Sequence, residues 1–237
     1  VTILDILEKG QTTYLAGSAG GMEMIWVEPG SFSMGSPYTE PGRWGDETQR
    51  NITITKGFYL GKYELTQNEY QIIMAGNDNG LDPTPSEFDG YPNRPVEKVS
   101  WDDAQVFLNR LQSFEKQSNY LPGGWEFSLP TEAEWEYACR AGTTSAYSWG
   151  SSIDGSHANW NFGNDMNRTV DVGQYSPNPW GFYDMHGNVF EWVIDWYGIY
   201  PSQTVDPIAT YSDNRKANRG GSWLATARDV RSAGRGY

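Results

Sequence analysis

The sequence between Asp184 and Glu191 is the part of the chain best suited to binding a metal ion. It has a carboxylate at each end and a glycine, Gly187, between them. Two carboxylates and the backbone carbonyls of a glycine-containing turn are hard oxygen ligands, which calcium prefers. The same residues could also form an ordinary turn whose acids face solvent or cap a strand. Both interpretations are open at this point.

Thiol and imidazole chemistry have less support. The single cysteine, Cys139, lies in Glu134-Trp-Glu-Tyr-Ala-Cys-Arg140, which has the pattern of a helix. A lone helical cysteine beside aromatic residues is usually a small buried hydrophobe. The two histidines, His157 and His186, are too few for a three-histidine iron centre. No phosphate-binding loop or serine nucleophile motif is present, and no acid pair stands out as catalytic. We therefore expect no iron.

Composition excludes several classes of partner. The formal charge of −13 repels phosphate backbones, and no cluster of lysine and arginine offsets it, so we expect no nucleic-acid partner. No apolar stretch is long enough to span a membrane, and residues 1–9 lack the basic start and apolar run of a signal peptide. The sequence as written predicts a soluble chain without membrane insertion, and it does not indicate a compartment.

Local patterns predict a few helices and short strands separated by many turns. Three hydroxyl residues are followed three positions later by an acid, which is the capping pattern of a helix start: Thr66 with Glu69, Ser100 with Asp103, and Thr131 with Glu134. After the second start, an apolar stripe at helical spacing is expected to face the core: Ala104, Phe107, Leu108, Leu111 and Phe114. Short strands are predicted over 22–27, 51–55 and 58–63. The fold class is therefore α+β.

Five long motifs, in order along the chain from about Gly21, give the sequence a family resemblance. It resembles the formylglycine-generating enzymes of the sulfatase-modifying factor family in the stretches 24–35, 63–70, 94–104, 129–138 and 180–192. This resemblance implies a variant of the C-type lectin fold with little regular secondary structure. It also implies a single domain over 21–237, preceded by an N-terminal extension over 1–20.

The resemblance also implies calcium sites. In those enzymes the segment that matches the acidic turn binds a structural calcium ion, and carried over position by position its ligands would be Asp184, the backbone of Gly187, the backbone of Val189, and Glu191. A second family calcium site would use Asn159, Trp160 and an acid such as Asp165, although the intervening loop is shorter here.

The C-terminal stretch Arg219-Gly-Gly-Ser-Trp223 matches the entry to the active site of the same enzymes. There, two cysteines follow the motif and hold the copper that is used for oxidation. The matching positions in this chain are Ala225 and Val230. Neither side chain has a sulfur that could bind a metal or act as a nucleophile. We therefore expect no copper and no oxidase activity.

A second group with this fold shares the same entry motif, namely the variable proteins of diversity-generating retroelements. In that group, template-directed mutation of adenines leaves fixed residues between varied ones. The fixed pattern is present at Arg219–Trp223, Ala227-Arg228, Arg231–Ala233 and Arg235. The remaining residues, here called the varied positions, are Leu224, Ala225, Thr226, Asp229, Val230, Gly234, Gly236 and Tyr237. All of them can be reached by mutating the first two bases of an AAC codon.

The sequence therefore predicts a non-enzymatic protein that binds a protein or other macromolecular ligand through a diversified surface beginning at about residue 224. Gly220, Gly221 and Trp223 are expected to be structural. Most varied positions are expected to be exposed: Leu224, Ala225, Thr226, Asp229, Gly234 and Tyr237. One alternative is a formylglycine-generating-type oxidase or related maturation enzyme. Another is a structural or assembly module.

Overall fold

Three helices are seen in the computed structural model, which describes residues 12–14, 21–117, 124–163, 167–210 and 214–237. They are α1 (Gln67–Met74), α2 (Trp101–Gln117) and α3 (Glu132–Arg140). At the start of α1 and of α3 the hydroxyl and the acid exchange hydrogen bonds with each other's backbone, and Ser100 and Asp103 do the same before α2. All three predicted helix starts are confirmed.

The strands of the described residues form three small antiparallel sheets. β2 (Glu23–Val27) lies between β1 (Thr12–Tyr14) and β5 (Phe58–Gly61). β3 (Gly30–Met34) pairs with β4 (Arg50–Ile54), and β6 (Glu191–Trp196) pairs with β7 (Lys216–Arg219). The predicted strands over 22–27, 51–55 and 58–63 correspond to β2, β4 and β5 within a residue or two. The predicted α+β class with little regular structure is confirmed.

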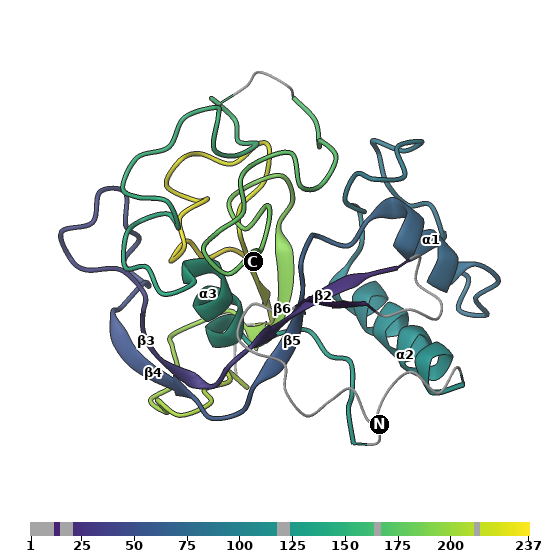
Figure 1. Cartoon of the computed structure of the whole chain (residues 1–237), viewed down its shortest axis with the longest axis horizontal. Coiled ribbons are helices and arrows are strands. Elements are labelled where there is room, and N and C mark those ends of the chain that lie inside the picture. The colour runs from purple at the N-terminus through teal and green to yellow at the C-terminus, as the bar shows by residue number, and fades with distance from the viewer. Residues whose placement is uncertain (1–11, 15–20, 118–123, 164–166, 211–213) are drawn as a thin grey trace.

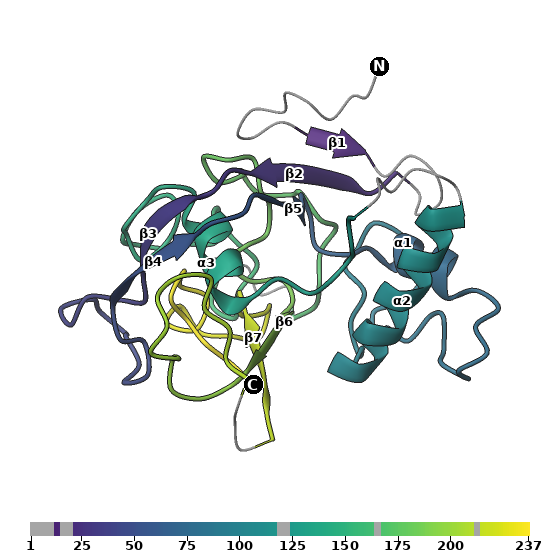
Figure 2. The ribbon, with the colours of Figure 1, turned by 90° about the horizontal axis from the view of Figure 1, so that it is seen from below.

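Two apolar clusters organise these elements. The larger one joins the strands to α3 around Ile25, Ile52, Trp135 and Val193. The smaller one lies where α1 packs on α2, and the two views show this pair of helices to one side of the strands (Figures 1 and 2). No helix in the described part of the chain is long and apolar enough to cross a membrane.

The stripe predicted along α2 faces the core only in part. Phe107 and Leu111 are buried against α1, Ala104 and Leu108 are half-buried, and Phe114 is 42% exposed. The reason is geometric: α1 has 8 residues and α2 has 17, so the shorter helix cannot cover the whole length of the longer one.

The C-terminal segment, defined here as Arg219–Tyr237, begins at the last residue of β7. In Figure 1 its yellow trace runs among the green loops that connect α3 to β6. Hydrogen bonds in both directions between Asn218 and Gly236 bring the end of the segment back to β7. The segment therefore leaves β7 at Arg219 and returns to it at Gly236.

Candidate functional site

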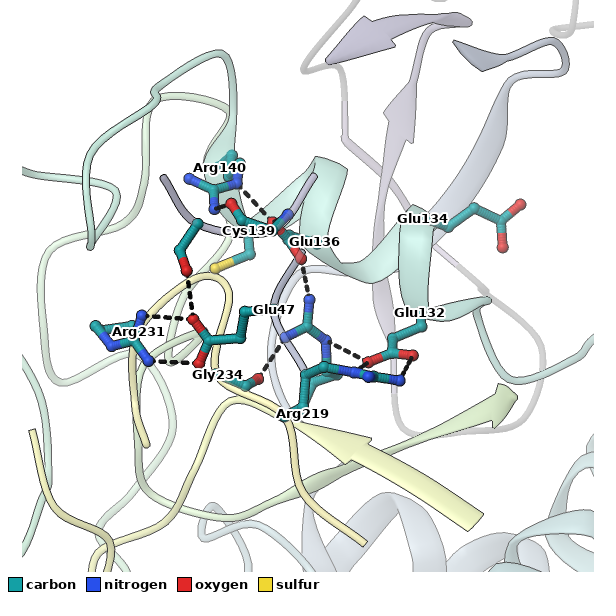
Figure 3. Close-up of polar contacts among 12 residues, drawn as sticks. Glu47, Glu132, Glu134, Glu136, Cys139, Arg140, Arg219, Arg231 and Gly234 are labelled. Atoms are coloured by element: carbon teal, nitrogen blue, oxygen red, sulfur yellow. Dashed lines mark hydrogen bonds and ion pairs between the residues drawn. The ribbon is translucent and has the colours of Figure 1, made fainter. Parts of the chain in front are cut away.

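Three arginines with side chains no more than 1% exposed hold the C-terminal segment in place. The first, Arg219, reaches α3, where its guanidinium pairs with Glu136 and lies 3.5 Å from Glu132 (Figure 3). It also donates to the carbonyl of Gly234, within the segment itself. One buried guanidinium thus joins the beginning of the segment, its later turn, and α3.

The other two arginines fix the second half of the segment. Arg231 contacts Glu40 at 2.6 Å and Glu47 at 2.5 Å, both in the loop between β3 and β4. Arg235 binds both oxygens of Glu132, at 2.6 and 2.9 Å. A buried charge is tolerated only when it is paired and hydrogen-bonded, so each pair constrains where the backbone can lie.

Two consecutive glycines follow Arg219 in a backbone conformation that other residues rarely adopt. Gly220 has φ +85° and Gly221 has φ +77°. A Cβ on Gly221 would also collide with the side chain of Val230. The expected structural role of these glycines therefore has a physical basis. Trp223 is half-buried, and its ring lies edge-on to Phe88 with the centroids 5.6 Å apart.

The varied positions differ widely in exposure. Leu224 is 58% exposed and Tyr237 is 62% exposed, and Thr226 is also exposed, as expected. Asp229 and Gly236 are half-buried. The expectation of exposure is wrong for Ala225 and Gly234, which are buried, and Val230 is also fully buried.

Packing explains these corrections. Ala225 and Val230 share an apolar cluster with Ala146 and Tyr147. A side chain on Gly234 would collide with the carbonyl of Asp229, earlier in the same segment. A Cβ on Gly236 would likewise strike the side chain of Asn218. These four positions support the fold, whereas the side chains of the other four lie at the surface, mostly exposed for Leu224, Thr226 and Tyr237 and partly exposed for Asp229.

A loop far away in sequence borders the exposed part of the segment. Trp44, in the loop between β3 and β4, lies under the guanidinium of Arg228, whose central carbon is 3.2 Å from the ring centroid. The Trp44 indole also donates to Asp229 at 3.2 Å, and Asp229 accepts from the Thr226 hydroxyl at 2.6 Å. Trp44 could not be identified from the sequence, because nothing local shows that its loop packs against the C-terminus.

The acidic turn between Asp184 and Glu191 is closely packed. Burial raises the pKa of Asp184 to about 6, and burial together with the nearby Asp184 charge raises the pKa of Glu191 to about 7. One oxygen of Asp184 accepts from Gly173 N at 2.6 Å, whereas the other, Oδ1, is buried and has no hydrogen-bond partner among the described residues. Such an oxygen is available to a cation.

A third acid, Glu64, joins this turn and was not anticipated. It accepts hydrogen bonds from the Asn188 amide at 2.6 Å and from Val189 N at 2.9 Å. Burial raises its pKa well above the usual range, and the charges of Asp184 and Glu191 raise it further. Three carboxylates thus lie close enough to repel one another. Within the described residues no group of three or more His, Cys, Asp or Glu side chains has metal-binding geometry, so backbone carbonyls would have to complete a calcium site.

Of the residues expected to form the second calcium site, Asn159 lies beside the acidic turn. The backbone carbonyl of Asn159 accepts from Asn188 N at 2.9 Å, and its amide donates to Asn188 and to the Arg168 carbonyl. Trp160 is half-buried. Asp165 falls outside the described residues, so this second site stays a prediction.

A family model confirms the resemblance drawn from the sequence. The model for the sulfatase-modifying factor enzyme 1-like domain matches residues 16–237. The chain belongs to this family. It is 30% identical to the chaperone protein LppX of Paenibacillus barcinonensis, covering 86% of this chain and 79% of LppX. It is 34% identical to the formylglycine-generating enzyme of Mus musculus, covering 85% of this chain and 66% of the mouse enzyme.

The chain is also similar to part of a longer protein and to two solved structures. The chain is 30% identical to the serine/threonine-protein kinase pkn1 of Chlamydia pneumoniae, covering 90% of this chain but only 35% of the kinase. Among solved structures, PvdO from Pseudomonas aeruginosa matches with a TM-score of 0.82 and 27% identity over 98% of this chain and 93% of PvdO. Treponema denticola variable protein 1 matches with a TM-score of 0.76 over 95% of this chain and 92% of that protein; at 23% identity it shows a shared fold.

The one thiol of this family member is in an environment that suppresses reactivity. Cys139 is fully buried on α3, and burial raises its pKa to about 12. Its sulfur lies 3.6 Å from His186 Nε2, but burial lowers the pKa of that histidine to about 4, which leaves the imidazole neutral near pH 7. Neither the thiolate nor the imidazolium is favoured, so the pair does not resemble an activated nucleophile.

Proposed function

We propose that this family member is a non-enzymatic binding protein whose C-terminal segment presents a diversified surface. The observation that carries the proposal is the contrast within that segment. Fixed arginines and glycines hold its backbone from inside, whereas the varied side chains of Leu224, Thr226 and Tyr237 are exposed. A rigid backbone carrying exposed and interchangeable side chains is the general design of a binding surface.

Two further observations support this proposal over an oxidase. Ala225 and Val230, which match the positions of the paired thiols in formylglycine-generating enzymes, lie in an apolar cluster with Tyr147. The fold is also that of Treponema denticola variable protein 1. We propose that the chain, like variable proteins of diversity-generating retroelements, is altered by adenine-directed mutation of its final codons. The partner would be a protein or another macromolecule.

An activity assay separates the proposal from the oxidase alternative. The protein, with and without added copper, would be incubated with a cysteine peptide carrying a sulfatase motif, and formylglycine would be measured by mass spectrometry. The mouse enzyme is the positive control. We expect no conversion, because no thiolate is available to bind copper. Copper-dependent turnover above the protein-free background would refute the non-enzymatic assignment.

A selection tests the binding role directly. Two displayed libraries would be panned against the same test protein, hen lysozyme. One library varies the accessible positions Leu224, Thr226, Asp229 and Tyr237, and the matched control library varies two packing positions, Ala225 and Val230. We expect folded, lysozyme-specific binders only from the first library. Failure of the first library to yield binders, despite normal display of folded protein, would contradict the proposal.

We also propose that the acidic turn holds a structural calcium ion. The unpartnered Oδ1 of Asp184 and the nearby carboxylate of Glu191 fit a hard divalent cation, and the backbone carbonyls of Gly187 and Val189 would complete the ligand set. Calcium bound to the native state alone would raise stability. Chelation should therefore lower the melting temperature, and Glu191→Ala should remove most of that difference. Identical melting curves in chelator and in excess calcium would contradict the site.

A further inference from the structure

The acidic turn and the C-terminal segment are directly connected. Trp223 N donates to the carbonyl of Asn188 at 2.9 Å, and His186 Nδ1 lies 2.7 Å from the carbonyl of Val230. The turn therefore contacts the segment near its beginning and again at Val230. Five of the varied positions lie between these contacts or at the second one.

The acidic turn and the C-terminal segment are also packed closely together where the segment begins. Glu191 pairs with Arg219 in the β6–β7 ladder, so the last acid of the turn lies opposite the first residue of the segment. The added Cβ of a residue at Gly220 would lie 3.7 Å from Glu191 Oε1 and 3.8 Å from the carbonyl of Met185. The Glu191 carboxylate is thus packed against the backbone at the point where the segment begins.

Asn188 connects the acidic turn to its neighbours by hydrogen bonds. It adopts a left-handed conformation, with φ +59°, and its side-chain amide bonds to Glu64 on one side and to Asn159 on the other. Its carbonyl accepts from Trp223. Further along, Asn161 N donates to the carbonyl of Ala225 at 3.1 Å, so the chain after Asn159 also supports the segment.

We infer that calcium binding at the acidic turn controls the order of the C-terminal segment, so that the diversified surface is formed only when the ion is bound. With calcium, the carboxylates of Asp184 and Glu191 are drawn to one centre and Asn188 stays aligned with Trp223. Without the ion, the buried Oδ1 of Asp184 has no partner among the described residues, so the turn opens more readily and its hydrogen bond to Trp223 is lost with it. The inference rests on the proposed calcium site and on the proposed binding role of the segment.

Hydrogen exchange measured by mass spectrometry tests this coupling without any knowledge of the ligand. The full chain would be compared in excess calcium and in chelator, with calcium binding measured in parallel by titration calorimetry. We expect peptides covering 219–230 to exchange at least about tenfold more slowly with calcium, because an ion at about 100 times its Kd suppresses opening of the bound region by up to about 100-fold. Peptides from α2, which lies outside the site, serve as the internal control and should change little.

A variant pair sharpens the experiment. Glu191→Gln removes a ligand charge and should abolish the calcium-dependent protection of 219–230, whereas the exposed change Leu224→Asn should leave that protection intact. Calcium binding without a change in exchange at 219–230 would overturn the coupling while leaving the calcium site in place. No heat of calcium binding would overturn both. Neither result bears on the lysozyme selection, which tests the binding role alone when performed in calcium.

Discussion

Replacing Val230 with asparagine tests whether the varied positions divide into packing and surface residues. Val230 is 0% exposed, and its apolar neighbours include Ala146, Tyr147 and Ala225. Asparagine is the residue that an unmutated AAC codon would encode, so the change is natural for the proposed mutational process. Its matched control is Leu224→Asn, which introduces the same side chain at a position that is 58% exposed.

The expected costs differ by several kcal/mol. Losing the buried valine side chain costs about 1.5–3 kcal/mol of hydrophobic stabilisation. Burying an amide without hydrogen-bond partners adds about 1–3 kcal/mol. The free energy of unfolding should therefore fall by roughly 3–5 kcal/mol for Val230→Asn, which is a large part of the typical total. For Leu224→Asn the change should be under about 0.5 kcal/mol.

Equilibrium unfolding in urea, in the presence of calcium, measures both values. Val230→Ala is a useful third variant because it leaves a cavity without adding a polar group, and its cost should fall between the other two. The order of the three costs is the result that matters. If Val230→Asn and Leu224→Asn cost the same within about 0.5 kcal/mol, position 230 is not part of the core and belongs to the accessible surface.

Two further predictions concern buried charge. Arg219→Met should reduce the free energy of unfolding in urea by about 1–3 kcal/mol, because Oε2 of Glu136 loses its buried partner while Arg140 still pairs with Oε1. A cost below about 0.5 kcal/mol would contradict this role. Burial raises the pKa of Asp195 from 3.8 to about 6, so the folded state binds a proton more tightly than the unfolded state. Lowering the pH from about 8 to about 5 should therefore increase the contribution of this group to stability by about 1.4 kcal/mol, because pH 5 is one unit below the folded pKa. Urea unfolding at both pH values should show a smaller increase for Asp195→Asn, and an equal increase would contradict the assignment.

Helix starts could be predicted from the sequence because the interactions that define them are local. In each capping box a hydroxyl and an acid three residues apart bond to each other's backbone, so a four-residue pattern carries the information. The pair of positive-φ glycines at Gly220 and Gly221 is another local feature. The positions of three strands, β2, β4 and β5, also followed from alternation and residue type.

The burial of the C-terminal segment could not be predicted in the same way. Val230 is buried because Tyr147 and Ala146, from a distant part of the chain, pack against it. Trp44 joins the surface because Arg228 and Asp229 reach it from the other end of the chain. A codon-level pattern marks which residues could vary, but only three-dimensional packing decides which of them a ligand could touch.

The buried arginines offer a reason why such a segment could tolerate variation. If its backbone were held by the varied side chains, each new sequence would change the fold. Instead, Arg219, Arg231 and Arg235 direct their guanidinium groups inward to carboxylates on α3 and on the loop between β3 and β4. Breaking such pairs is costly, so they define one backbone path whatever lies at Leu224 or Thr226. Because the ion pairs and the acidic turn reach the segment from different elements, we expect the arginines to set its path and the proposed calcium ion to set how firmly it is held.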